Sequence, residues 1–253
     1  MAVVLTEFSG GVAVICINRP EVKNAVNLEV SEALADAVDE FENRRDLTIG
    51  ILTGSGGTFC AGMDLKAFAR GELPTIPGRG FGGITERPPK KPLIAAVEGW
   101  ALAGGFELAL AADLIVASSD AKFGIPEVKR GLVAAAGGLL RLPKILPYPL
   151  AMEMAITGDP LTAHDAFKYG LVNRVTEPGQ ALAGAKELAA RVASNGPLAV
   201  RATKQVLSMA TNYTDASAFV SQRALTDPVF ASADAQEGSR AFAERRPPVW
   251  VGA

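Results

Sequence analysis

Apolar and polar positions along the first part of the chain predict strands and helices in alternation. Residues 12–18 (VAVICIN) alternate and are rich in β-branched side chains, which is typical of a strand. Residues 26–44 carry apolar side chains three or four positions apart and predict an amphipathic helix. Residues 49–56 (IGILTGSG) form a short apolar run closed by glycines, which indicates a buried strand. This order predicts a β–α–β crossover.

The same alternation continues to about residue 150 and then gives way to helical patterns. Residues 93–105 predict a strand that enters a glycine turn, and residues 106–119 predict a helix followed by a strand. From about residue 150 onward the segments predict helices only. The expected architecture is an α/β core followed by an all-helical region, and such helical tails often pack on a neighbouring subunit.

A stretch rich in glycine and proline, residues 69–92, interrupts this alternation and has no clear period. A loop of this length inside a compact domain is usually functional or disordered. Two interpretations stay open at this point: a lid over a binding site, and a mobile surface loop.

Composition and charge exclude several classes of protein. The 253 residues are 49% hydrophobic and 21% charged, as in a well-packed globular protein, with a formal net charge of −2. This balance gives no electrostatic reason to expect nucleic acid or an anionic membrane as the main partner. The two cysteines, Cys16 and Cys60, suit small core residues of a reducing compartment. With no signal peptide pattern and no apolar run of about 20 residues, we expect a cytoplasmic protein.

Two segments place glycine-containing turns before predicted helix starts. In residues 58–66 (TFCAGMDLK), a turn of small residues precedes Met63, and in residues 98–114 Gly104 and Gly105 precede a helix with Glu107 in its first turn. Backbone N–H groups at a helix start have no partner within the helix and attract negative charge. Each turn alone is also explained by helix capping. The apolar neighbours of Glu107, however, indicate a buried carboxylate, which is costly without a partner or a role.

A third segment, residues 121–143, contributes a second carboxylate. Glu127 follows Pro126 after a predicted strand, and the small residues 134–138 open another helix. Taken alone, a Pro-Glu pair is common at surface helix starts.

Together these segments resemble the crotonase (enoyl-CoA hydratase/isomerase) superfamily over nearly the whole chain. The matching pieces are NRPEVKNAVN, TFCAGMDL, LIAAVEGWALAGGFELALAADLIVAS, AKFGIPEVKRGL, GGLLRLP and EGSRAFAERR. The resemblance implies a β–β–α spiral core (residues 1–195) carrying the active site and a helical trimerisation region (residues 196–253). It also implies an acyl-CoA thioester substrate, trimers or dimers of trimers, and no metal or redox cofactor, since coenzyme A is part of the substrate.

The resemblance also assigns roles to individual residues. It implies an oxyanion hole built from the backbone N–H groups of Met63 and Gly104, with Glu107 and Glu127 as the acid–base pair of a reversible syn hydration of a trans-2-enoyl-CoA. Glu127 is expected to exchange the Cα proton, and Glu107 to position and activate the water. Coenzyme A is expected to contact Val22, Ala25, Ala61, Asp64, Lys66 and, from a neighbouring subunit, Arg245.

This chain departs from the commonest family pattern in three places. Met63 stands where alanine is frequent, Ala103 stands where a third glycine is common, and Ala134–Ala136 replace a run that contains proline in many hydratases. Small residues at positions 134–136 suggest that the acyl site admits a bulky acyl group. A strict preference for a four-carbon enoyl-CoA would contradict this hypothesis.

Several functions remain compatible with the sequence. The first is an enoyl-CoA hydratase. Alternatives on the same fold are a dehydratase of another 3-hydroxyacyl-CoA, such as a carnitinyl-CoA-like substrate, and an enoyl-CoA isomerase, which needs one base only. A protein that binds acyl-CoA without catalysis is the alternative from another class, because a fold alone does not prove activity.

Overall fold

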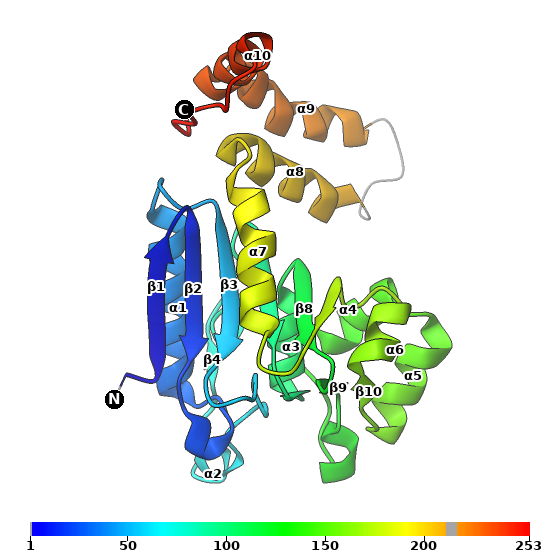
Figure 1. The fold of residues 1–253 in the computed structure, drawn as a ribbon. Helices are drawn as coiled ribbons and strands as arrows, with labels where there is room; N and C mark the ends of the chain where they lie inside the picture. Colours follow the sequence, from blue (N-terminus) through cyan, green and yellow to red (C-terminus); the bar gives the residue numbers. More distant parts are fainter. Residues whose placement is uncertain (1, 211–216) are drawn as a thin grey trace.

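A six-stranded sheet organises the protein in a computed structural model, which describes residues 2–210 and 217–253 (Figure 1). Its strand order is β1-β2-β3-β6-β8-β11, with β1 antiparallel to β2 and the other pairs parallel. The strands are β1 (Val4–Ser9), β2 (Val12–Ile17), β3 (Ile49–Gly54), β6 (Leu93–Val97), β8 (Leu114–Ser118) and β11 (Arg174–Thr176).

Helices cover both faces of this sheet, which explains why its central strands are apolar throughout. On one face α1 (Leu28–Asn43) lies over β1 and β2 and buries Val30, Leu34 and Val38 in the main core. On the other face α7 (Ala181–Ala193) packs through Ala185 and Ala189, whose small side chains let the helix approach the sheet closely. The predicted strands 12–18 and 49–56, the helix between them and the parallel crossover are confirmed.

A smaller sheet beside the first one positions the three segments of interest. Its order is β10 (Leu161–Thr162), β9 (Lys122–Gly124) and β7 (Trp100–Leu102), and a parallel bridge between Cys60 and Ala101 extends it by one position. Three times the chain leaves the large sheet, passes through the small one and enters a helix. These helices are α2 (Leu65–Phe68), α3 (Gly104–Ala111) and the 3-10 helix η2 (Glu127–Arg130). Because β7 and β9 are parallel, their ends and the helix starts that follow meet at one edge.

The 69–92 segment is folded onto the core. It contains the short strands β4 (Thr75–Ile76) and β5 (Gly80–Phe81), and residues 80–85 are buried. The hydroxyl of Ser31 in α1 donates to the carbonyl of Pro74 (2.8 Å), and Arg79 pairs with Asp39 (2.6 Å). Of the two interpretations of this segment, a mobile surface loop is therefore wrong for its buried part, and the lid remains a prediction.

Three strands correct the expected pattern of elements. The chain is not all-helical after residue 150, because Leu161–Thr162 pairs with β9 and Arg174–Thr176 pairs with β8 as the edge of the large sheet. Two or three residues are too few to show a periodic pattern, so only the pairing partners define these strands. The edge strand β1 was also not predicted. It is mostly exposed and is fixed by its antiparallel pairing with β2 across the turn at Gly10 and Gly11.

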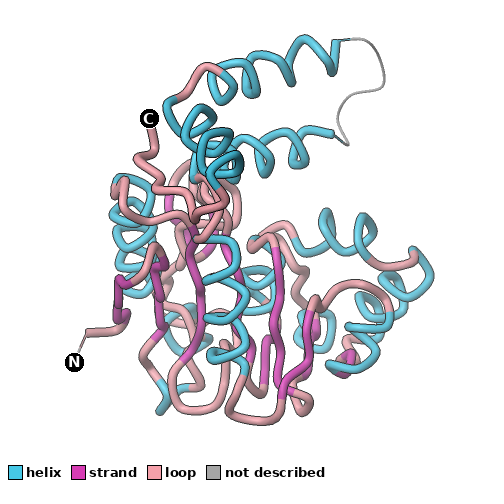
Figure 2. Tube along the Cα trace, turned by 45° about the horizontal axis from the view of Figure 1, so that its top comes forward, coloured by secondary structure: helices cyan, strands magenta, loops and turns pink. Residues whose placement is uncertain are grey.

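The remaining helices fall into two groups. Around the small sheet lie α4 (Gly138–Ile145), α5 (Tyr148–Thr157) and α6 (Ala163–Lys168). The C-terminal helices α8 (Pro197–Ala210), α9 (Ser217–Phe230) and α10 (Ala233–Glu244) lie beyond the end of α7, at the opposite end of the molecule from α2 (Figures 1 and 2). The indole N–H of Trp250 donates to the carbonyl of Ser194 (2.9 Å) and fastens the C-terminus there. Within the described residues, no helix is long and apolar enough to cross a membrane.

Candidate active site

A cavity of about 440 Å³ opens where the three helix starts meet. It is lined by Ala61 and Met63 from the first turn, by Gly104 and Glu107 from α3, and by Glu127 from η2. The apolar side chains of Phe68, Leu73 and Phe81 also line it, as do the small residues Ala135 and Ala136 from the loop before α4. The structure thus brings both predicted glutamates and both predicted backbone donors to one mostly apolar pocket.

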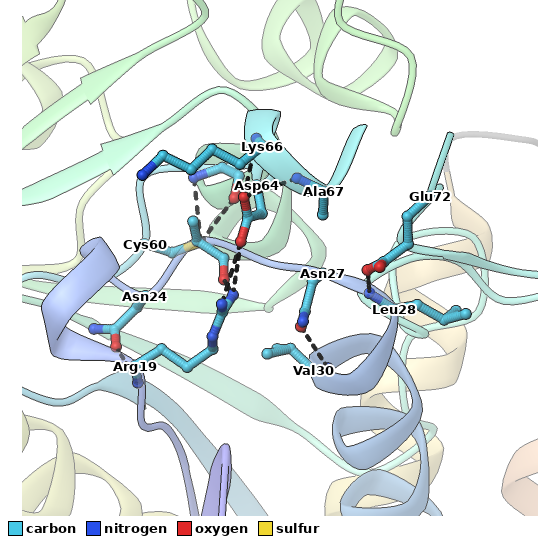
Figure 3. Close-up of polar contacts among 12 residues, drawn as sticks. Arg19, Asn24, Asn27, Leu28, Val30, Cys60, Asp64, Lys66, Ala67 and Glu72 are labelled. Atoms are coloured by element: carbon cyan, nitrogen blue, oxygen red, sulfur yellow. Dashed lines mark hydrogen bonds and ion pairs between the residues drawn. The ribbon is translucent and has the colours of Figure 1, made fainter. Parts of the chain in front are cut away.

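The first turn is held by backbone hydrogen bonds on both sides of Met63. The N–H of Ala61 donates to the carbonyl of Lys23 (3.0 Å), and that of Asp64 donates to the carbonyl of Val26 (2.9 Å). The carboxylate of Asp64 caps α2 and pairs with Arg19 at 3.2 Å (Figure 3). No hydrogen bond within the described residues uses the N–H of Met63. That N–H is therefore available to a ligand.

The second backbone donor lies directly beside the first turn. Gly104 is the first residue of α3, where an N–H has no partner inside the helix. A Cβ atom on Gly62 would lie only 2.9 Å from the carbonyl oxygen of Leu102 and 3.2 Å from the nitrogen of Gly104. Only glycine permits this approach, and its φ of 97° adds a second reason. The contact places the turn that leads into Met63 against the start of α3 at Gly104.

Glu107 is buried, and its carboxylate accepts hydrogen bonds from two backbone N–H groups. Its side chain is 2% exposed, and its Oε1 accepts hydrogen bonds from the N–H groups of Ala136 and Gly138, both at 2.8 Å. Burial raises the pKa of Glu107 above its ordinary value, while the two N–H groups and the charge of Arg141 act in the opposite direction. Donors that bind a carboxylate favour its ionised form.

Glu127 has a different environment. Its Oε2 is buried and has no hydrogen-bond partner among the described residues. Burial raises the pKa of Glu127 to about 7, and the negative charge of Glu107 adds to the shift. Burial thus raises the pKa of both carboxyls, but two N–H donors and Arg141 oppose the shift at Glu107, whereas the charge of Glu107 adds to it at Glu127. Such a difference in surroundings is the arrangement expected of an acid–base pair.

Of the residues expected to contact coenzyme A, only some lie at the pocket. Ala61 lies on the pocket wall, whereas Val22, Ala25, Asp64 and Lys66 lie in or beside the adjoining turns. Arg245 ends α10, and no residue of the described C-terminal helices lines the pocket of the same chain. These roles in binding coenzyme A stay predictions.

Two features of the site were not identified from the sequence. Phe81 packs against Gly104, since a Cβ atom there would lie 2.5 Å from its ring. Arg141 donates to the carbonyls of Thr85 (2.6 Å) and Ala136 (3.4 Å). The glycine pair at 137–138 indicated the start of the helix that carries Arg141. No local pattern indicated that this arginine reaches the segment around Thr85.

Comparisons with known proteins agree with this geometry. The family model for enoyl-CoA hydratase/isomerase matches residues 7–253. An enoyl-CoA hydratase of Mycobacterium tuberculosis H37Rv is similar in structure, with a TM-score of 0.98 and 58% identity over all of both chains. A carnitinyl-CoA hydratase structure from Mycobacterium avium gives a TM-score of 0.80 at 42% identity, again over both whole chains. A carnitinyl-CoA dehydratase of Salmonella typhi is 42% identical, covering 96% of each chain. The expected spiral core with a helical C-terminal region is confirmed, and the chain belongs to the enoyl-CoA hydratase/isomerase family.

Proposed function

We propose that this protein catalyses the reversible addition of water to a trans-2-enoyl-CoA, giving a 3-hydroxyacyl-CoA. The observation that carries the proposal is that Glu107 and Glu127 line one pocket, where Oε1 of Glu107 accepts two hydrogen bonds and Oε2 of Glu127 is buried without a hydrogen-bond partner among the described residues. Hydration requires a group that removes a proton from water and a group that delivers a proton to Cα.

The environments of the two carboxyls support a division of roles. Glu107, ionised, takes a proton from the water whose oxygen forms the bond to Cβ. Glu127, protonated, delivers its proton to Cα. If both carboxyls act from one face of the double bond, the water oxygen and the proton are added to that face, which is a syn addition.

The N–H groups of Met63 and Gly104, two residues that line the pocket, would hold the thioester oxygen. Negative charge builds up on this oxygen as the hydroxyl oxygen adds to Cβ, so donors placed for it stabilise the transition state. Loss of one comparable donor in other enzymes costs about 2.7–4 kcal/mol. The coenzyme A portion would leave the pocket past Ala61 and the turns that contain Val22, Ala25, Asp64 and Lys66.

A second candidate is a dehydratase for a carnitinyl-CoA-like substrate. Glu86, Phe68 and Phe81 are among the residues that line the pocket. A carboxylate and aromatic faces are the groups that bind a trimethylammonium cation. The chemistry at Cα and Cβ is the same in both candidates, and only the acyl group differs.

One substrate panel tests both candidates. We would follow loss of the conjugated enoyl thioester absorbance with crotonyl-CoA, crotonobetainyl-CoA and 5,5-dimethylhex-2-enoyl-CoA, the neutral isostere of the betaine. Hydration of the neutral substrates supports the first proposal. A preference for the cation over its isostere that falls about two- to fivefold in Glu86→Gln supports the second, because an exposed charge contributes modestly. Inactivity on all three contradicts both and favours isomerisation or simple acyl-CoA binding.

We also propose that the active form is a homotrimer or a dimer of trimers, in the cytoplasm. Large apolar side chains on the C-terminal helices face solvent in the single chain, among them Phe219, Phe230 and Phe242 at 61%, 79% and 88% exposure. A neighbouring copy would bury them and bring Arg245 to the coenzyme A. Light scattering should give three or six times the chain mass of 26.3 kDa. A fully active monomer would contradict this assembly.

A further inference from the structure

Arg141 lies on α4, next to the pocket but outside the chemistry described above. Its side chain is partly buried, and its guanidinium donates from Nη2 to the carbonyl of Thr85 at 2.6 Å and from Nη1 to the carbonyl of Ala136 at 3.4 Å. An arginine stays charged even where it is partly desolvated. A positive charge therefore lies next to Ala136, a residue that lines the pocket.

The contact with Ala136 leads directly to Glu107. The carbonyl of Ala136 accepts from Arg141, and the N–H of the same residue donates to Oε1 of Glu107. Gly138, the other donor to Glu107, opens the helix that carries Arg141. Arg141 thus braces the short loop whose two N–H groups orient the carboxylate.

The contact with Thr85 reaches a second wall of the pocket. Thr85 belongs to the 69–92 segment, in which Phe81 packs against Gly104. One guanidinium therefore joins the loop that holds Glu107 to the segment that packs against Gly104.

Gly137 shows how closely the guanidinium fits the loop. A Cβ atom at this position would lie 2.1 Å from Nη1 of Arg141, and the φ of Gly137 is 97°. The backbone of the loop and the arginine occupy adjoining space with no room for a side chain between them.

The charged groups around Glu107 come from three elements. Glu127 and Arg130 of η2 and Glu86 of the 69–92 segment line the same pocket, and Arg141 approaches from α4. Arg141 acts on the pKa of Glu107 in the direction that keeps the carboxyl ionised, against the effect of burial.

We propose that Arg141 is a positioning residue of the hydration site, which fixes the loop that orients Glu107 and supplies a positive charge that favours its carboxylate form. This inference rests on the proposed hydratase function, in which Glu107 acts as the base. A purely structural brace would affect the amount of folded enzyme or its turnover, but not the pH at which Glu107 gains a proton.

The test compares pH–rate profiles of the full-length chain and three variants, using the enoyl-CoA that the wild type hydrates. Arg141→Gln is expected to lower kcat at least about tenfold with little change in KM, because misplacing a reacting group is costly. It should also move the acidic limb of the pH–rate profile, where kcat falls as Glu107 gains a proton, to higher pH. The reason is that loss of the positive charge raises the pKa of Glu107. Arg141→Lys keeps the charge, so it should lower kcat without moving that limb. Lys144→Gln removes an exposed charge from the same helix and should match the wild type.

The outcomes separate this inference from the function on which it rests. A wild type that hydrates no enoyl-CoA contradicts the proposed function. An active wild type whose acidic limb stays in place in a folded Arg141→Gln variant contradicts the role of Arg141 alone. If Arg141→Gln does not fold, Arg141→Met takes its place as a neutral variant that keeps a long side chain. An acidic limb at higher pH than in Arg141→Lys supports the inference, and a limb at the same pH in both variants overturns it.

Discussion

Replacing Glu127 by Gln is expected to lower kcat for hydration by about 10²- to 10⁴-fold, the range for loss of one acid–base group. The amide keeps the size of the side chain, so the pocket keeps its shape, but it cannot deliver a proton to Cα. Steady-state rates on the best enoyl-CoA of the panel measure the effect. Glu153→Gln, on the exposed face of α5, is the matched control and should keep wild-type activity.

The environment of Glu127 also predicts a pH dependence for the wild type. Its pKa is raised to about 7, mainly by burial, and the active pair carries one proton. Hydration should therefore decline as pH rises through about 7, when that proton is lost. Dehydration should follow the same profile, because the singly protonated pair is the active form in both directions. A rate that does not change between pH 6 and pH 9, at substrate concentrations far below KM, would exclude Glu127 as the acid.

The Glu127→Gln substitution should affect stability in the direction opposite to its effect on activity. Because the folded-state pKa of Glu127 lies above its unfolded value, its ionised form is disfavoured by folding. This cost is absent below the unfolded pKa and complete above about pH 7. At pH 8 the Glu127→Gln variant is therefore expected to melt at the same temperature as the wild type or higher, which shows that lost activity does not come from unfolding.

Replacing Glu107 by Gln is expected to cause a loss of similar size, about 10²- to 10⁴-fold in kcat. The amide oxygen can still accept from the N–H groups of Ala136 and Gly138, so the loop should keep its position while the base is removed. Glu107→Asp tests the placement separately, because it keeps the charge but withdraws it by one methylene. It too should be strongly impaired.

The residual activity of Glu107→Gln carries further information. The charge of Glu107 contributes to the raised pKa of Glu127, so its removal should move the alkaline limb to lower pH. An unmoved limb would mean that the two carboxyls are not electrostatically coupled. If the variant lost hydration but still migrated a double bond, a one-base isomerase would replace the hydratase proposal.

Much of the fold could be predicted because its central elements follow their local patterns. The apolar spacing of α1 and the continuous apolar run of β3 identify these elements from short windows of sequence. The strands β1 and β11 escaped prediction for a physical reason. The first is mostly exposed, the second has three residues, and both are defined by the partner strand with which they pair.

The sequence by itself determined the family and the two glutamates, because short motifs and their order along the chain carry that information. Only the tertiary structure decided what surrounds those glutamates. The donors to Glu107 lie 29 and 31 residues away, and Thr85 lies 56 residues from Arg141. Burial, hydrogen bonding and nearby charge set the pKa of a carboxyl. All three arise from contacts between segments far apart in the chain, so no local pattern could assign Glu107 and Glu127 their different environments.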